Sequence, residues 1–330
     1  MAIFSKKHHD RRVNFAGAED AAQRFRPGNR LLAVLVGMLL ALPVFAQPAG
    51  TNRPLYVFNV GMARVCFLNV NRNDAIAAYR VFLENSGRRF GNIYKANPEV
   101  YDDTPAYEMA IQHQPINLAV MDPWQFLTMD IHQQMKPFFT SMENGKVGRR
   151  YVVLTRRESG LNTLSSLRGK NILQLEMASE NVGKIWLDTQ LLAGKLGTQQ
   201  SFFESVEVVA KPSAAVLPVF FGKYSACMVD DESFELMKEL NPQVGRSLQI
   251  VAVSDIFADV VICLREGGWA SEKFKSDTIQ TLNQLHLDPA GQQICTLFKI
   301  DRLVPFEDSQ LETIRKLRAT YESLQKAKSP

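Results

Sequence analysis

Residues 55–84 read LYVFNVGMARVCFLNVNRNDAIAAYRVFLE, which is a strand pattern followed by a helix pattern. The short apolar run at 55–60 predicts a buried strand. Residues 74–84 then carry apolar side chains at helical spacing, among them Ile76 and Leu83. A buried strand followed by an amphipathic helix is the repeating unit of α/β folds.

The same alternation continues along the chain and predicts two lobes. Residues 182–196 carry another helical stripe, and the last sixty residues have a largely helical pattern. Alternation of this kind predicts mostly parallel sheets with helices on both faces. One set lies before residue 155 and one after it, with no long linker between them, which favours lobes joined by crossing strands. The further predicted strands are 116–121, 151–154, 172–175, 206–209, 226–229, 250–253 and 260–264.

The N-terminal region has the composition of an export signal. Residues 31–46 (LLAVLVGMLLALPVFA) form an uncharged apolar run behind a basic segment. A full membrane span needs about 20 residues, so the run predicts a signal peptide over 1–46, cleaved after Ala46. A retained signal anchor is the alternative. The basic flank stays in the cytoplasm in either case, so we expect the body in the periplasm.

The charge of the chain belongs to its leader. The formal net charge is +4, and residues 1–46 carry the same excess, which leaves the rest neutral. No basic surface for nucleic acid is therefore expected. The cysteines are dispersed and contain no C-x-x-C pair, which favours free buried thiols, although export permits disulfides. They are Cys66, Cys227, Cys263 and Cys295.

The usual catalytic motifs are missing from the sequence. It contains no phosphate loop, no G-x-G-x-x-G, no G-x-S-x-G and no H-E-x-x-H. The histidines after the leader, His113, His132 and His286, are far apart, so surface or packing roles are expected for them. We therefore predict a protein that is not an enzyme and that uses no metal or cofactor.

In open α/β sheets, ligands bind beyond the carboxyl ends of the strands. The residues that follow the predicted strands are therefore the candidates for a binding site. They are residues 61–64, 122–124, 178–181, 230–232 and 255–259.

Several segments of the chain form a recognisable series. They are Tyr107-Glu108-Met109 with INLA (116–119) and DPW (122–124), RRESGL (156–161) with LRGK (167–170), FGKYSA (221–226), and LDPAGQQ (287–293). In their order and spacing, over residues 54–320, they resemble one family, the periplasmic phosphate, phosphite and phosphonate-binding proteins of ABC importers.

The resemblance implies a type 2 periplasmic-binding fold and a role in transport. One lobe would comprise residues 50–155 plus 255–330 and the other 156–254, with two crossing segments as the hinge. A monomer would bind a small anionic or zwitterionic ligand, such as a phosphonate, and deliver it to an ABC permease in the inner membrane. The alternative is a periplasmic sensory or adaptor domain of the same fold that acts through a protein partner.

The family's anion site lies at a helix N-terminus in the second lobe, where backbone N–H groups and the helix dipole favour a phosphoryl oxygen. Ser179, Glu180 and Asn181 match it here, and Glu180 departs from the pattern because a carboxylate repels a phosphoryl group. An ordinary capped helix with Glu180 in its first turn is the alternative.

Other side chains are placed in the ligand site by the same resemblance. Glu232 and Asp259 match positions that hold a ligand's amino group, with helix capping by Asp230 or Asp231 and a solvated turn at Asp259 as the alternatives. Asp122 would line the cleft from the first lobe, and Arg64 could neutralise a phosphoryl group. Trp124 lies beside Asp122, either in the cleft or packed in the core.

Overall fold

The computed structural model describes residues 55–67, 70–90, 93–176 and 180–327. The predicted signal peptide and Ser179 lie outside these residues, so the structure does not test them. In the part of the chain that is described, no helix is long and apolar enough to cross a membrane.

The first lobe is built on a six-stranded sheet with the order β11-β4-β10-β3-β1-β2. β1 is parallel to β2 and to β3, whereas β10 and β11 run antiparallel to their neighbours. The sheet is therefore mixed. Its two antiparallel strands are the ones that the chain adds after it returns from the second lobe. Its strands are β1 Leu55–Ala63, β2 Ile93–Tyr101, β3 Leu118–Met121, β4 Met135–Met142, β10 Val261–Arg265 and β11 Arg302–Pro305.

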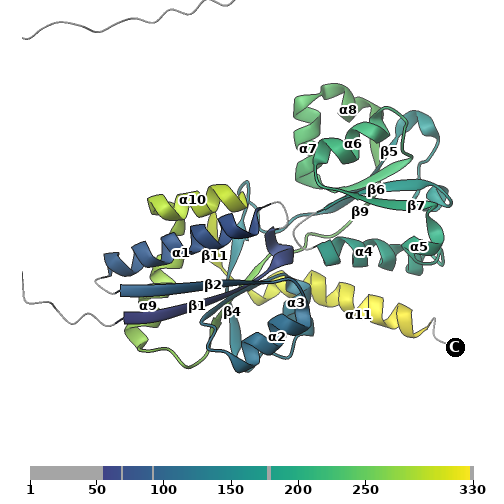
Figure 1. The fold of residues 1–330 in the computed structure, drawn as a ribbon. Helices are drawn as coiled ribbons and strands as arrows, with labels where there is room; N and C mark the ends of the chain where they lie inside the picture. The colour runs from purple at the N-terminus through teal and green to yellow at the C-terminus, as the bar shows by residue number, and fades with distance from the viewer. Residues whose placement is uncertain (1–54, 68–69, 91–92, 177–179, 328–330) are drawn as a thin grey trace, which may run out of the picture. The chain divides into compact units, whose positions relative to one another are not determined.

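Helices cover both faces of this sheet (Figure 1). On one face, α1 (Arg72–Arg89), α9 (Glu272–Asn283) and α10 (Pro289–Phe298) enclose an aromatic and aliphatic core with the short η1 (Arg64–Phe67) and η4 (Leu285–Leu287). On the other face, α2 (Thr104–His113) and α3 (Pro123–Thr128) enclose a second core. This layered arrangement lets the apolar faces of the sheet and the apolar stripes of the helices bury each other.

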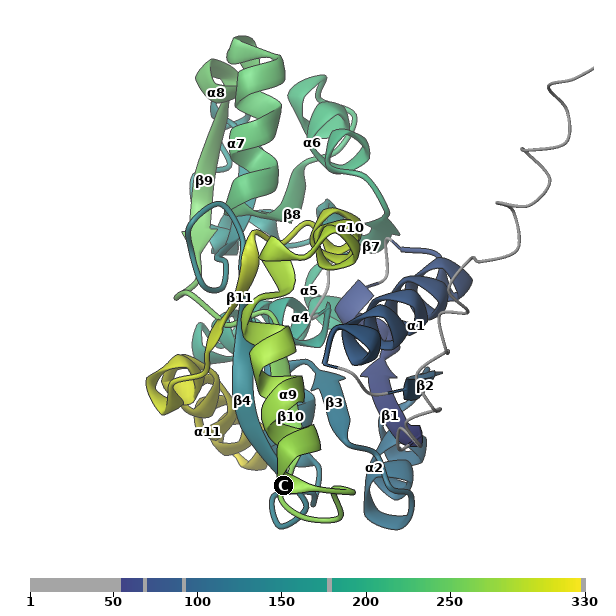
Figure 2. The same ribbon diagram turned by 90° about the vertical axis from the view of Figure 1, so that its left-hand side faces the viewer.

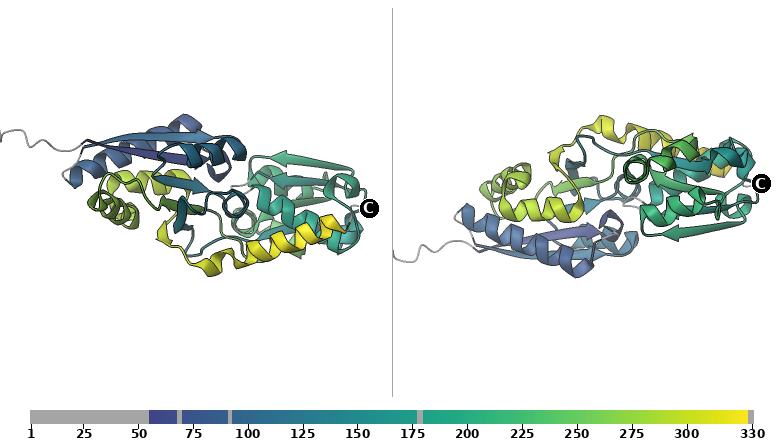
Figure 3. Two further views of the ribbon diagram at one scale, coloured as in Figure 1. Left: turned by 90° about the horizontal axis from the view of Figure 1, so that it is seen from below. Right: turned by 90° about the horizontal axis from the view of Figure 1, so that it is seen from above.

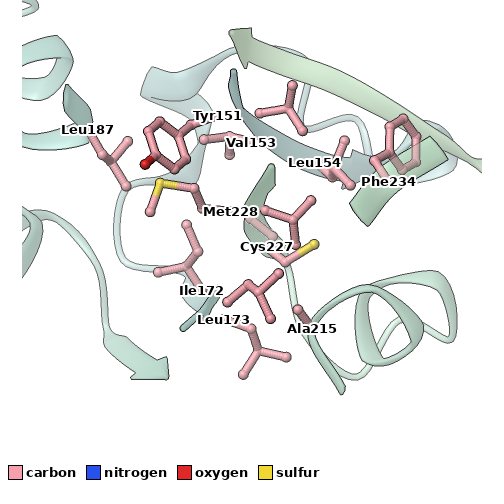
Figure 4. Close-up of a cluster of buried hydrophobic side chains, with 14 of the residues drawn as sticks. Tyr151, Val153, Leu154, Ile172, Leu173, Leu187, Ala215, Cys227, Met228 and Phe234 are labelled. Carbon is pink, nitrogen blue, oxygen red and sulfur yellow. The ribbon is translucent and has the colours of Figure 1, made fainter. Parts of the chain in front are cut away.

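The second lobe is built on a five-stranded sheet with the order β7-β6-β8-β5-β9. Its strands β8 and β9 are visible in Figure 2. Val153 and Met228 lie on one face of this sheet and Leu173 with Cys227 on the other, so the core covers both faces (Figure 4). The strands are β5 Tyr151–Arg156, β6 Asn171–Leu175, β7 Ser205–Val209, β8 Ala226–Asp230 and β9 Leu248–Val253. The helices are α4 Glu180–Ala193, α5 Gln199–Phe202, α6 Pro212–Phe220, α7 Asp231–Leu240 and α8 Pro242–Ser247, with the short η2 Arg157–Ser159 and η3 Leu164–Leu167.

The boundary between the lobes differs from the expected one at two places. β5 begins at Tyr151 and lies in the second sheet, although residues up to 155 were expected in the first lobe. After the short η5 (Asp308–Leu311), the C-terminal helix α11 (Glu312–Lys326) packs against α4, as Figure 3 also shows. Its Ile314 and Leu317 join the core of the second lobe because they form the apolar stripe of that helix.

The direction of the strands determines where a site can form. β1 to β4 run one way in the first sheet, and β6 to β9 run one way in the second. The first crossing segment, residues 143–150, joins the carboxyl end of β4 to the edge of the second sheet at which β6, β7, β8 and β9 end. The second, residues 254–260, joins the end of β9 to the edge at which β1 and β3 end. Both crossing segments therefore connect the two carboxyl edges, where ligands bind in open α/β sheets.

Candidate ligand site at the crossing segments

A buried arginine ties the two crossing segments together. The Arg149 guanidinium donates to both carboxylate oxygens of Asp259, at 2.5 and 3.1 Å, and to Glu143 at 3.0 Å. The side chains of Arg149 and Asp259 are only 18% and 11% exposed. A two-pronged guanidinium–carboxylate pair of this kind is short and directional.

Backbone contacts reinforce this pair. Arg149 and Phe257 exchange backbone hydrogen bonds of 2.9 Å as an isolated antiparallel bridge. Two residues further on, the Tyr151 backbone N–H donates to the Ser254 hydroxyl at 2.8 Å. The crossing segments are therefore held side by side where they leave the sheets.

Glu143 has an unusual protonation equilibrium. Burial raises its pKa to about 7, and although Arg149 lowers the pKa, the nearby carboxylates of Glu232, Asp259 and Asp230 raise it. One guanidinium thus faces several acids, and Glu143 is partly protonated near neutral pH. In the described residues, no group of three or more His, Cys, Asp or Glu could hold a metal ion.

We expect Glu143 to make stability depend on pH. Its pKa is higher in the folded protein than its ordinary 4.5, so folding favours the protonated form, and stability falls as the pH rises from about 4.5 to 7. The variant E143Q has no such charge. The difference in the free energy of unfolding, E143Q minus the original protein, should therefore increase as the pH rises through this window. Urea titrations of both proteins at several pH values measure it. A difference that stays constant or falls with pH would contradict the assignment.

Asp230, Asp231 and Glu232 have different roles at the start of α7. Asp230 caps the helix by accepting from the Ser233 backbone N–H at 2.8 Å, which confirms the capping alternative for this residue. Asp231 accepts from the Arg150 backbone N–H at 3.3 Å. Glu232 accepts from the Asn144 side-chain amide at 2.9 Å and so reaches the first crossing segment.

Asp122 lies near the same place from the first lobe. It is fully buried and caps α3 by accepting from the Gln125 backbone N–H at 2.8 Å. Burial raises the pKa of Tyr151, and the charges of Asp259, Asp230 and Asp122 raise it further. The charges of acids from both lobes therefore act on Tyr151.

The N-terminus of α4 lies next to Tyr151. α4 begins at Glu180, so Glu180 and Asn181 belong to its first turn. A side-chain carbon at Gly183 would lie 3.1 Å from the Tyr151 ring, so the start of this helix packs directly against Tyr151. The start of α4 therefore lies at the same tyrosine whose pKa Asp259 and Asp122 influence, whereas Glu232 contacts Asn144 of the first crossing segment.

The remaining predicted residues have structural partners. The Arg64 guanidinium donates to the backbone carbonyls of Phe67 and Val70, at 2.8 and 3.0 Å, and so supports its own turn after β1. Trp124 packs against the core of the second lobe and meets Tyr321 of α11 edge to face. The solvated turn considered for Asp259 is wrong, since this residue is 9% exposed and paired with Arg149.

Sequence reasoning missed Arg149 and Glu143. Both lie in a charged turn between two predicted strands, where a solvated loop is the ordinary expectation. The local signal is the pair of glycines in this segment, Gly145 and Gly148, whose positive φ angles of 74° and 79° mark a tight turn. All four cysteines are free, with Cys66 half-buried and the others buried.

Comparison with known proteins agrees with this architecture. The family model described as the periplasmic substrate-binding protein of phosphonate ABC transporters matches residues 71–311. The chain belongs to this family. It is therefore a periplasmic phosphonate-type substrate-binding protein with the two-lobed fold that the sequence predicted. No curated protein matches the sequence significantly.

Solved structures share the fold of this phosphonate-family protein at low sequence identity. A Xanthomonas citri protein bound to ATP is 13% identical, with a TM-score of 0.60 over 82% of this chain and 98% of that one. The binding component of an ABC phosphonate transporter from Pseudomonas aeruginosa is 13% identical, with a TM-score of 0.57 over 82% and 88%. PhnD1 from Prochlorococcus marinus, in complex with methylphosphonate, is 12% identical, with a TM-score of 0.55 over 81% and 98%.

Proposed function

We propose that the protein binds a small phosphorus oxyanion, such as a phosphonate, at the crossing segments and delivers it to an ABC permease of the inner membrane. The observation that carries the proposal is that the N-termini of α4 and α7 both lie at Tyr151, on the carboxyl edge of the second sheet. Gly183 of α4 packs against the Tyr151 ring, and Asp230, the N-cap of α7, lies opposite Tyr151 in the strand pairing. The structurally similar phosphonate-transporter component from Pseudomonas and the methylphosphonate complex from Prochlorococcus support the choice of ligand class.

In this proposal the two ends of the ligand meet different surroundings. The first turn of α4, which includes Glu180 and Asn181, binds the phosphoryl oxygens through backbone N–H groups and the helix dipole. Ser179, the residue before this helix, contributes its hydroxyl to the same oxygens in this proposal. Glu232 and Asp259 face an amino group of a zwitterionic ligand, while Asp122 lines the site from the first lobe. Arg64, which already supports its turn, contributes positive potential from the end of β1.

We further propose that the protein acts by binding alone, without turnover, and that it works as a monomer. The apolar run at 31–46 serves as its signal peptide and is cleaved after Ala46. A ligand that contacts both lobes favours the closed arrangement, and the permease recognises that arrangement.

The ligand is tested on protein purified from the periplasm of an expressing bacterium. Methylphosphonate, 2-aminoethylphosphonate, phosphite, phosphate and ATP are compared by thermal shift and calorimetry. A phosphonate at 100 times its Kd should stabilise the protein by about 2.7 kcal/mol. If no phosphorus oxyanion shifts the melting temperature, the proposed ligand class is wrong.

The position of the anion is tested with E180Q. Removing a negative charge from the first turn of α4 should strengthen the binding of inorganic phosphate about two- to fivefold, since a charge at a helix N-terminus is worth about 0.3–1 kcal/mol. The matched control is E204Q, because Glu204 is exposed and precedes β7 at the opposite edge of the second sheet. Equal phosphate affinities for the two variants would move the anion away from α4.

A further inference from the structure

The first lobe contains a cavity in a place where a core is normally filled. Its volume is about 90 Å³, whereas a water molecule needs about 10–15 Å³ on this measure. Protein interiors rarely leave voids much larger than one water, because each unfilled volume loses van der Waals contacts. The walls come from both sides of the layer between the sheet and its helices, and include Val60, Met62, Phe82, Leu118, Ile262 and Ile294.

The cavity changes character at the carboxyl edge of the sheet. Ser141, Glu143, Arg149 and Asp259 line it there, at the end of β4 and just before β10. The register supports this placement, because Val261 lies opposite Met121 at the end of β3. An apolar chamber thus ends at a cluster of charged groups beside the crossing segments.

The charge at this end indicates which ligand is complementary to it. Glu143 and Asp259 share the single guanidinium of Arg149, so two carboxylates face one cation within the lining. Burial is the largest cause of the raised pKa of Glu143, and the carboxylates of Glu232, Asp259 and Asp230 raise this pKa further against the effect of Arg149. The lining and its surroundings therefore hold more carboxylates than cations, which favours a ligand with a positive charge.

We propose that this cavity binds the apolar part of an amine whose ammonium group lies against Glu143 and Asp259. A short alkyl chain or a phenyl ring occupies the space between the apolar walls, and the ammonium group stays at the carboxyl edge of the sheet. The apolar part of the site lies in the first lobe and requires no phosphorus group, while its charged end shares Asp259 with the site proposed above, so the inference deepens that function by adding an apolar chamber for the ligand. It would extend the range of ligands to amines with an apolar group.

The probes are hexylamine and 2-phenylethylamine, added to the same periplasmic preparation. Both should raise the melting temperature and give measurable heats of binding. Methylamine lacks the apolar part, hexanol lacks the charge, and hexanoate carries the opposite charge. Each of these three should bind at least about tenfold more weakly than hexylamine, which is the size of one hydrogen bond to a charged group or of two buried methylene groups.

Two variants separate the parts of the cavity. L118F places a larger side chain in the apolar part of the cavity and so reduces its volume, and E143Q removes one carboxylate at the charged end. Each should weaken hexylamine about tenfold or more. The matched control E204Q should bind hexylamine as the original protein does. Binding of methylphosphonate, measured on the same L118F preparation, should be retained, which also shows that this variant is folded.

Proton release provides a second readout that does not depend on L118F folding. An ammonium group beside Glu143 lowers its pKa, so binding at pH 6.5 should release a proton, and the heat should vary with the ionisation enthalpy of the buffer. E143Q should show no such variation. The other charged or titratable groups that influence Glu143 or share a groove with it are Arg149, Asp259, Glu232, Asp230, His286, Lys299 and Asp301.

Several results would overturn the amine site. They are the absence of any shift with both amines, equal affinities for hexylamine and hexanol, and unchanged hexylamine binding in L118F and E143Q. These results do not depend on whether a phosphonate binds. If the amines do not bind but methylphosphonate does, only the amine site is rejected. If the amines bind but no phosphorus oxyanion does, the proposed phosphorus ligand is rejected and the amine site is kept.

Discussion

Replacement of Arg149 by methionine is expected to lower the free energy of unfolding by about 3–5 kcal/mol. The variant R149M leaves Asp259 buried without the guanidinium that contacts both of its oxygens, and Glu143 loses its closest cation. Burying a carboxylate without that partner is costly because its hydration is not replaced. Urea denaturation of the original protein and of R149M at pH 7.5 measures the difference.

Controls for R149M come from the same chain. R149K keeps the charge but not the two-pronged geometry, so it should be intermediate. R315A removes a similar two-pronged pair with Asp308 that is exposed, and it should cost no more than about 1 kcal/mol. The double variant R149M/D259N should be more stable than R149M. Equal losses in R149M and R315A would contradict a structural role for the buried pair.

Replacement of Gly148 by alanine is expected to destabilise the protein by about 3 kcal/mol or more. Its φ of +79° disfavours any other residue by about 1–2 kcal/mol. An added side-chain carbon would also lie 2.3 Å from the Phe257 carbonyl oxygen, which accepts the Arg149 backbone N–H. The crossing segments would have to separate, and each lost hydrogen bond costs about 1 kcal/mol.

Gly145 provides the matched control for this substitution. It lies in the same turn with a φ of +74°, and nothing lies within 4 Å of an added side-chain carbon. G145A should therefore cost only the backbone term of about 1–2 kcal/mol. Urea denaturation compares the two variants. If G148A and G145A are equally stable, the close approach of the crossing segments is not essential to the fold.

The strands that sequence reasoning found are those with uninterrupted apolar runs. The ones that it missed are β2, β4 and β11, and each breaks the pattern. β2 contains Lys95, Pro98 and Glu99, which an edge strand tolerates because one side has no partner. β4 contains Pro137 near its start, and β11 has only four residues. Local hydrophobicity cannot reveal strands whose place depends on their neighbours.

The sequence alone also predicts only part of the candidate site, because some of its residues follow recognisable strands and others do not. Acids such as Asp122 and Glu232 follow predicted strands, and the rule that ligands bind at strand carboxyl ends is sufficient to find them. Arg149 carries no such signal, because its partner Asp259 is 110 residues away. Burial of the pair depends on how both crossing segments pack.

The sequence by itself determined the α/β class, the two lobes, the family and most of the acids around Tyr151, because these follow from periodicity, strand ends and short motifs. The tertiary structure alone decided that Arg149 joins the crossing segments, that Glu143 has a pKa of about 7, and that the first lobe encloses a cavity. It also decided that α11 packs on the second lobe. The physical reason is that burial, charge pairing and empty volume depend on contacts between distant segments, which no local pattern encodes.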